Sequence, residues 1–296
     1  MRRKDLFIAL LVLWPTIACA ADALEASYPE GPLWRGGKLY FAEMAADRVT
    51  VSDKRGARPF FTEKGCGPTA LAPYGEGFLV LCHRGGRIVT VDKKGRALRR
   101  WDRDEGGRRL MNPNDAAADG SGGVYFSDPG PFAERSRETP LGRIMHLSAD
   151  GALRRVSGPL AYPNGVHVRD GALYVSEHLR GRILRFPIGA AGRLGAAHVF
   201  ADLSGRPPAA RYASPYPLAG PDGLEFGPDG ALYVALYGEG RFARLSPAGD
   251  LIGFIDMPAR FLTNIAFGKE GFATTGTFDN RSPSQAGEVT TGAGVP

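Results

Sequence analysis

The chain has 296 residues and a formal net charge of +6, and 43% of its residues are hydrophobic, enough for a substantial core in one large all-β unit or two ordinary domains. The basic residues are interspersed with acidic ones, as in RRWDRDEGGRR, so the charge argues against a nucleic-acid-binding stripe. The 41 glycines are about twice the usual ~7% share, which favours short strands and tight turns over long helices.

The N-terminal residues have the features of a secretory signal peptide. A basic start (residues 2–4) precedes an apolar run (residues 6–14) that is too short to span a bilayer, and small residues at 18–20 form a cleavage site. Neither a full twin-arginine pattern nor a good lipoprotein signal is present. We therefore expect Sec export, cleavage near Ala20 and a periplasmic or secreted protein without membrane association. An uncleaved membrane anchor is the alternative.

Signal cleavage would remove Cys19 and leave Cys66 and Cys82. These two cysteines flank the turn-like segment PYGEG, so a hairpin would place them opposite each other. In an exported protein this arrangement suggests a disulfide. The alternative is two unpaired buried thiols, because cysteine is often simply a small core residue.

A repeated motif divides the rest of the chain into six units. Each unit has a polar residue in a turn-forming segment, then a turn and an alternating or apolar run such as ALYVSEH, and five units add a third run led by arginine, such as RILRFP. Neighbouring polar positions are separated by between 39 residues (Glu30 to Thr69) and 58 residues (Asn164 to Asp222). The aligned residues are Glu30, Thr69, Asn114, Asn164, Asp222 and Asn264.

Spacing of this kind, with about four strands per unit, is typical of propeller blades. We therefore predict an all-β fold in which residues 21–296 form a single six-bladed β-propeller domain after a signal peptide at residues 1–20. The segment at residues 23–27 is expected to pair with the last blade and close the ring. Two Pro-rich loops, Pro131–Pro140 and Pro207–Pro217, interrupt the repeat and are candidates for substrate selectivity.

The aligned polar residues are expected to converge on the propeller axis. For a single copy, a plain turn is the simpler interpretation, because Pro, Asn, Asp and Gly are the usual turn residues. Together, however, the six positions all carry oxygen, none is cationic, and two are carboxylates, Glu30 and Asp222. Carboxylates gathered at one point need a cation. We therefore predict a central site for one divalent cation, with Ca²⁺ expected and Mg²⁺, Mn²⁺ or Zn²⁺ as alternatives.

The chain resembles the SMP-30/gluconolactonase/LRE-like lactonases in four motifs that follow one another at blade spacing: EGPLW, NPNDAAADGSGGVYFSDP, YPNGV and GPDGLEFGPDGALYVALYGEGRFARL. The resemblance covers nearly all of the mature chain. It implies an axial divalent cation held by Glu30, Asn164 and Asp222, with Asn114 contacting the metal or the substrate. Sugar lactonases often have an arginine two residues before this asparagine, where this chain has Asn112.

The resemblance also implies a metal-dependent hydrolase of a small-molecule lactone or ester, in which the cation polarises the carbonyl group and Asp222 acts as proton acceptor and donor. No GxSxG motif is present, which argues against a covalent acyl-enzyme. We expect a monomer. The predicted metal ligands are Glu30, Asn114, Asn164 and Asp222, and the predicted substrate-binding residues are Thr69, Asn112, Asn114 and Asn264.

Two other functions remain open at this point. The segment YPNGVHVRDGALYVSEHLRGRILRF also resembles a blade of strictosidine-synthase-like enzymes, which share the fold without the same metal chemistry. Propellers of the NHL type use the same face to bind ligands without catalysis. His83 and His178 could line the pocket, although histidines at such positions are more often structural.

Overall fold

The computed structural model describes residues 22–212, 214–281 and 285–296, so the predicted signal peptide at residues 1–20 lies outside the described residues. The described chain consists of β-strands and four short 3-10 helices. No helix in these ranges is long and apolar enough to cross a membrane. The 3-10 helices are Met44–Ala46, Glu134–Arg137, His178–Arg180 and Ala190–Gly192.

The strands form six antiparallel four-stranded units, here called blades 1 to 6, and all but the last follow the chain order from the innermost strand outward. A single ladder pair, Tyr237 with Phe261, joins blades 5 and 6 into one sheet. Blade 1 comprises β2 Pro29–Arg35, β3 Lys38–Glu43, β4 Arg48–Asp53 and β5 Gly56–Thr62. Blade 2 comprises β6 Pro68–Tyr74, β7 Gly77–Cys82, β8 Arg87–Val91 and β9 Ala97–Trp101. Blade 3 comprises β10 Ala116–Ala118, β11 Val124–Asp128, β12 Arg143–Leu147 and β13 Leu153–Arg155. Blade 4 comprises β14 Pro163–Arg169, β15 Ala172–Glu177, β16 Arg182–Pro187 and β17 His198–Asp202. Blade 5 comprises β18 Gly220–Phe226, β19 Leu232–Tyr237, β20 Arg241–Leu245 and β21 Leu251–Asp256. Blade 6 comprises β22 Phe261–Gly268, β23 Gly271–Thr277, β24 Ala286–Gly292 and β1 Asp22–Ser27.

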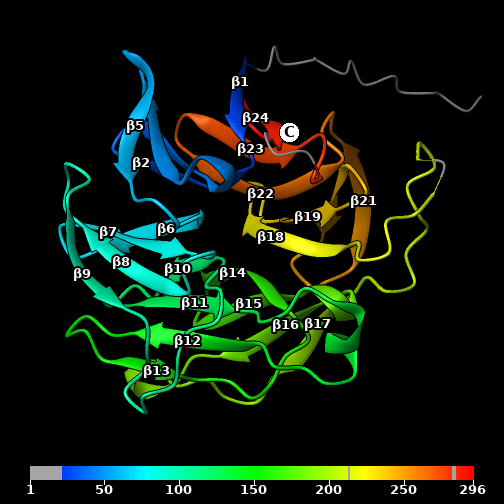
Figure 1. Ribbon diagram of the computed structural model, residues 1–296. Helices are drawn as coiled ribbons and strands as arrows, with labels where there is room; N and C mark the ends of the chain where they lie inside the picture. The colour runs from blue at the N-terminus through cyan, green and yellow to red at the C-terminus, as the bar shows by residue number, and fades with distance from the viewer. Residues whose placement is uncertain (1–21, 213, 282–284) are drawn as a thin grey trace, which may run out of the picture.

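The six innermost strands form a closed ring around a central axis. Each of β2, β6, β10, β14 and β18 contacts the next inner strand, and β22 returns to contact β2. Figure 1 shows the colours running round this ring until the red C-terminal strand lies beside the blue β1. Strand β1 pairs with β24 from Asp22↔Thr291 to Ser27↔Ala286, which confirms the predicted ring closure.

The core lies between the blades and follows the two-residue period of the strands. In β7, Phe78 and Val80 pack in one cluster with blade 1 side chains such as Val49, whereas Leu79 and Leu81 pack in a second cluster with side chains of blade 3. Successive residues of a strand point to opposite faces. A blade with apolar side chains on both faces is therefore fixed between its two neighbours.

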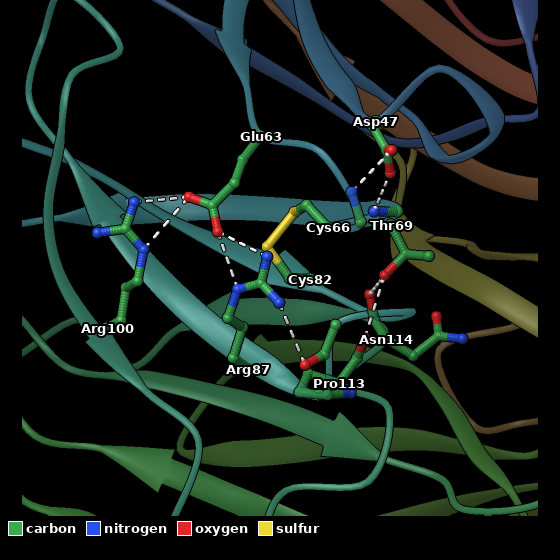
Figure 2. Close-up of a disulfide and its surroundings, with 12 residues drawn as sticks. Asp47, Glu63, Cys66, Thr69, Cys82, Arg87, Arg100, Pro113 and Asn114 are labelled. Carbon is green, nitrogen blue, oxygen red and sulfur yellow. Dashed lines mark hydrogen bonds and ion pairs between the residues drawn. A yellow bond between two sulfur atoms is a disulfide. The ribbon is translucent and has the colours of Figure 1, made fainter.

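Cys66 and Cys82 form a disulfide, so the first of the two alternatives for these residues is confirmed. Figure 2 shows the bond where β6 begins and β7 ends, close to Thr69. The chain before β6 is held further by Asp47, whose carboxylate accepts hydrogen bonds from the backbone N–H groups of Gly65 (2.8 Å) and Gly67 (2.7 Å). The disulfide therefore joins the segment before β6 to the end of β7 and reinforces blade 2 at this point.

We predict that Cys66→Ala/Cys82→Ala destabilises the protein without changing its fold. The cysteines are 16 residues apart, and a cross-link closing a loop of this size contributes about 3 kcal/mol to the free energy of unfolding. Urea unfolding with and without reductant measures the effect. Reductant should destabilise the wild type and leave the variant unchanged; equal stability of both proteins under oxidising conditions would contradict the prediction.

Candidate functional site

Five of the six aligned polar residues line one cavity of 190 Å³ at the end of the axis where the inner strands begin. They are Glu30, Thr69, Asn114, Asn164 and Asp222, and each is less than 7% exposed. Four lie within the first three residues of an inner strand, and Asn114 lies two residues before β10. Because the inner strands of the blades begin at the same end of the axis, side chains that are far apart in the sequence meet in one cavity.

Local irregularities in the inner strands aim several of these side chains at the axis. The ladder of blade 4 skips from Pro163 to Val166, and the ladder of blade 5 skips from Pro221 to Leu224. Asn164 lies in the first gap and Asp222 lies in the second in the same way. A bulged residue is free of the regular pleat, so its side chain can take a direction that a paired residue cannot.

Asn264 does not join this group. In blade 6 the gap lies between Leu262 and Asn264, so Thr263 occupies the bulge and Asn264 is paired with Thr275. A shift of one residue moves a side chain to the other face of a strand. Asn264 accordingly lines a separate cavity of 260 Å³, and its Nδ2 donates to Oδ1 of Asp115 at 3.3 Å.

Asn112 also lies outside the axial cavity. Its Nδ2 donates to the carbonyl oxygen of Gly130 at 2.8 Å, and its Oδ1 accepts from the Gly130 N–H at 2.7 Å. Both polar atoms of the amide are therefore engaged by the backbone of the loop that follows β11. Thr69 lines the cavity, but its hydroxyl donates to the carbonyl oxygen of Asn114 at 2.7 Å and so supports that residue (Figure 2).

Glu30 and Asp222 are buried carboxyl groups without a cationic side chain to balance them. Burial, followed by the charges of Asp222 and Asp115, raises the pKa of Glu30 well above its ordinary value. Burial, followed by the charge of Asp115, does the same to the pKa of Asp222. In the part of the chain that the structure describes, neither forms an ion pair with arginine or lysine. Two uncompensated carboxylates in one cavity favour the binding of a positive charge there.

The donor atoms of the cavity suit a hard cation. No group of three or more His, Cys, Asp and Glu side chains is placed to hold a metal ion within residues 22–212, 214–281 and 285–296. A cation here would therefore depend on the amide oxygens of Asn114 and Asn164 as well as on the two carboxylates. Carboxylate and amide oxygens are ligands typical of calcium, whereas zinc prefers histidine and cysteine.

Glycines allow the inner strands to approach closely at the axis. A Cβ on Gly165, next to Asn164, would collide with the backbone oxygen of Asp222 in the neighbouring blade. A Cβ on Gly31, next to Glu30, would collide with the backbone of Thr69 and Ala70, and Gly31 also has a positive φ of 42°. The glycine beside a cavity residue therefore allows its inner strand to lie close to the inner strand of the next blade.

His83 and His178 both line the cavity, and burial lowers the pKa of each to about 4. Nε2 of His178 donates to the carbonyl oxygen of Leu218 at 2.9 Å. Both imidazoles are therefore neutral near pH 7, and neither supplies the missing positive charge.

Sequence reasoning missed the aromatic side chains of the cavity, Tyr28, Phe132, Tyr162 and Tyr237. Two of them could have been found, because Tyr28 and Tyr162 occupy the same position in the motifs YPEG and YPNG, and both have a positive φ. The buried carboxyl group of Asp115 was also missed. Burial raises its pKa to about 6, and it accepts a hydrogen bond from the Val166 N–H at 2.9 Å.

Comparison with known proteins identifies a family and several relatives. Residues 28–275 match the model of the SMP-30/Gluconolactonase/LRE-like region. The 6-deoxy-6-sulfogluconolactonase of Pseudomonas putida is 25% identical over 86% of this chain and 85% of its own length. The gluconolactonase of Zymomonas mobilis is 26% identical over 84% of this chain and 75% of its own length.

Two solved structures have the same fold. A gluconolactonase from Xanthomonas campestris superposes with a TM-score of 0.69 at 22% identity, over 90% of this chain and 86% of that one. The calcium-binding protein regucalcin from Agrobacterium tumefaciens superposes with a TM-score of 0.67 at 18% identity, over 92% of this chain and 94% of that one.

We predict that Glu30→Gln/Asp222→Asn stabilises the cation-free protein. The pKa values of both groups are raised above their ordinary values of 4.5 and 3.8, so ionisation favours the unfolded chain and stability is lost as pH rises above those values. In EDTA, the variant should exceed the wild type by at least about 1 kcal/mol near neutral pH, with a smaller gap at lower pH. Thermal unfolding at several pH values measures this. Asp170→Asn, at a carboxylate that is 84% exposed, should give no gap.

We also predict that Gly165→Ala weakens cation binding. The added methyl group must displace the backbone of Asp222, and misplacing a ligand through its support typically costs about 10- to 100-fold in metal affinity. Calcium titration followed by calorimetry measures the affinity, and circular dichroism verifies that the strands persist. Gly158→Ala is the matched control, because a Cβ there meets nothing within 4 Å. Equal affinities for both variants would contradict the prediction.

Proposed function

The chain belongs to the SMP-30/Gluconolactonase/LRE-like family, and on that premise we propose that it hydrolyses a lactone in the axial cavity with the help of one divalent cation, expected to be Ca²⁺. The observation that carries the proposal is the pair of buried carboxylates, Glu30 and Asp222, which no cationic side chain of the described chain balances. A binding scaffold has no need of such a pair. A cation site does.

The residues that would hold the cation are Glu30, Asn114, Asn164 and Asp222, all of which line the cavity. When bound, a divalent cation supplies Lewis-acid polarisation of the lactone carbonyl group. The chain's own contribution is to fix the ligands before the substrate arrives. The Thr69 hydroxyl holds the backbone of Asn114, and Gly165 sets the position of Asp222.

Asp222 is the proposed proton acceptor. A water oxygen bonds to the carbonyl carbon while Asp222 takes a proton from that water. The bond between this carbon and the ring oxygen then breaks, and the ring oxygen receives the proton from Asp222. The sum of the steps is one lactone plus one water giving one hydroxy acid. Burial raises the pKa of Asp222 and strengthens it as a base, whereas a bound cation acts in the opposite direction.

Asn112 and Asn264 have a different proposed role from the one assigned by sequence. Because neither lines the axial cavity, we propose that each residue holds a neighbouring group in place and does not contact the substrate. Asn112 fixes the loop at Gly130, and Asn264 holds the carboxyl group of Asp115. We also propose export of a monomeric protein, for which the Cys66–Cys82 disulfide is supporting evidence, because such bonds persist in oxidising compartments.

We predict that Asp222→Asn abolishes lactone hydrolysis, with a loss of at least about 100-fold in kcat, because the proton acceptor is removed. Hydrolysis of δ-valerolactone by the chain lacking residues 1–20, followed by pH-stat, measures the rate. The same assay is run after chelation and after return of Ca²⁺, Mg²⁺, Mn²⁺ or Zn²⁺ one at a time. Activity should disappear with the chelator and return with one cation.

Asp170→Asn serves as the control, because this carboxylate lies on the surface and its loss should leave the rate unchanged. Full activity in Asp222→Asn would rule out the proposed base. Activity that is indifferent to the chelator would rule out the cation and favour another reaction class on the same fold. If the protein binds the cation but hydrolyses no lactone, a ligand-binding propeller becomes the better explanation.

A further inference from the structure

We propose that the axial cavity selects a compact lactone with an apolar alkyl or aryl substituent and discriminates against polyhydroxylated sugar lactones. The proposal rests on the lactonase function proposed above and adds the substrate class. It is derived from the side chains that surround the two carboxylates, from the hydrogen bonds that those side chains already make, and from the size of the cavity.

Four of the twelve residues that line the cavity are Tyr or Phe. Phe132 lies at their centre, with its ring centroid 4.7 Å from that of Tyr162, 5.2 Å from that of His178 and 6.1 Å from that of Tyr237. Tyr28 and Met44 complete the apolar lining. Aromatic faces gain contact energy from apolar groups, and they offer a sugar hydroxyl only weak interactions.

The hydroxyl groups of Tyr28 and Tyr237 already have partners within the protein, whereas Nδ1 of His83 and Nδ1 of His178 have none among the described residues. The hydroxyl groups of Tyr28 and Tyr237 are hydrogen-bonded to each other at 2.8 Å, and Nδ2 of Asn280 donates to the Tyr237 hydroxyl at 3.1 Å. The Thr69 hydroxyl is likewise engaged by a carbonyl oxygen. A sugar hydroxyl packed against the Tyr28–Tyr237 pair would lose its water without gaining a free partner on that side of the cavity.

The cavity is also unsuited to an anionic or a large substituent. No arginine or lysine is among its described lining residues, and the position before Pro113 is Asn112, whose amide is bound to Gly130. Its volume of 190 Å³ is below the range of roughly 300–1,000 Å³ that holds drug-sized ligands. The space therefore fits one lactone ring with a short apolar substituent or a fused aryl ring.

Phe132 is the residue that should determine this selectivity. It belongs to the Pro-rich loop Pro131–Pro140, and its ring is the loop's contribution to the cavity. The loop is anchored beside it, because the Ser136 hydroxyl donates to the carbonyl oxygen of Pro131 at 2.8 Å. Phe132 is therefore a fixed wall that a substrate's apolar group can pack against.

The experiment compares three six-membered lactones that share an alkoxide leaving group: δ-valerolactone, δ-octalactone and D-glucono-δ-lactone. Each kcat/KM is divided by the rate of the same lactone without enzyme, which removes differences in intrinsic reactivity. We expect δ-octalactone to be preferred over the sugar lactone by at least about tenfold, since a few buried methylenes are worth that much. Binding of the non-hydrolysable lactam analogue of δ-octalactone, measured by calorimetry, gives a readout independent of turnover.

Phe132→Ala should reduce the preference for δ-octalactone and weaken lactam binding, and Phe132→Leu should retain most of both. Leu141→Ala is the matched control, because Leu141 lies in the connection between the same two strands, is 60% exposed and does not line the cavity. This control should leave the preference unchanged. Thermal unfolding of each variant shows whether the fold is intact.

The two proposals fail in different ways. If δ-valerolactone is hydrolysed but the sugar lactone is the best substrate, lactone hydrolysis stands and the apolar preference is overturned. A preference for δ-octalactone that survives Phe132→Ala unchanged overturns the role of this residue. If none of the three is hydrolysed, the proposed function is overturned and the substrate class with it.

Discussion

The close approach of six inner strands at one axis is the constraint on which the rest of the structure depends. Gly31 and Gly165 make it possible, because a side chain at either position would strike the backbone of the next blade. The approach brings Glu30 and Asp222 into one small cavity, and no lysine or arginine is among the described residues that line it. The uncompensated negative charge is thus a consequence of packing, and it is what makes the site suitable for a cation.

The surroundings of the two carboxylates strengthen this effect. Aromatic side chains such as Tyr162 and Phe132 line the cavity beside the carboxylates, and charges interact more strongly in apolar surroundings than in water. Two further aromatic side chains, Tyr28 and Tyr237, use their hydroxyl groups to bind each other. The cavity therefore combines two carboxyl groups with aromatic side chains, so different parts of one ligand would meet surroundings of different polarity.

The repeat in the sequence predicted the blades, the ring closure and five of the residues that meet at the axis. The alignment also placed Asn264 at the axis. In the structure, however, Thr263 occupies the gap in the strand ladder of blade 6, and Asn264 is turned to the other face of the strand. A signal in the sequence was overlooked, because Thr263, like Asn164 and Asp222, stands two residues before a branched apolar residue of its strand. The aromatic wall was missed because Tyr28 and Tyr162 act through burial, which depends on side chains from other blades.

The pairing of β1 with β24 has a consequence for how the molecule is made. The two strands lie at opposite ends of the described chain, so β1 has no partner in blade 6 until β24 has been synthesised. Until then blade 6 lacks a strand and its open edge can pair with other chains. The ring is therefore completed only after all the other blades have been synthesised, and the interval before closure is when the chain is most exposed to aggregation and most in need of a chaperone.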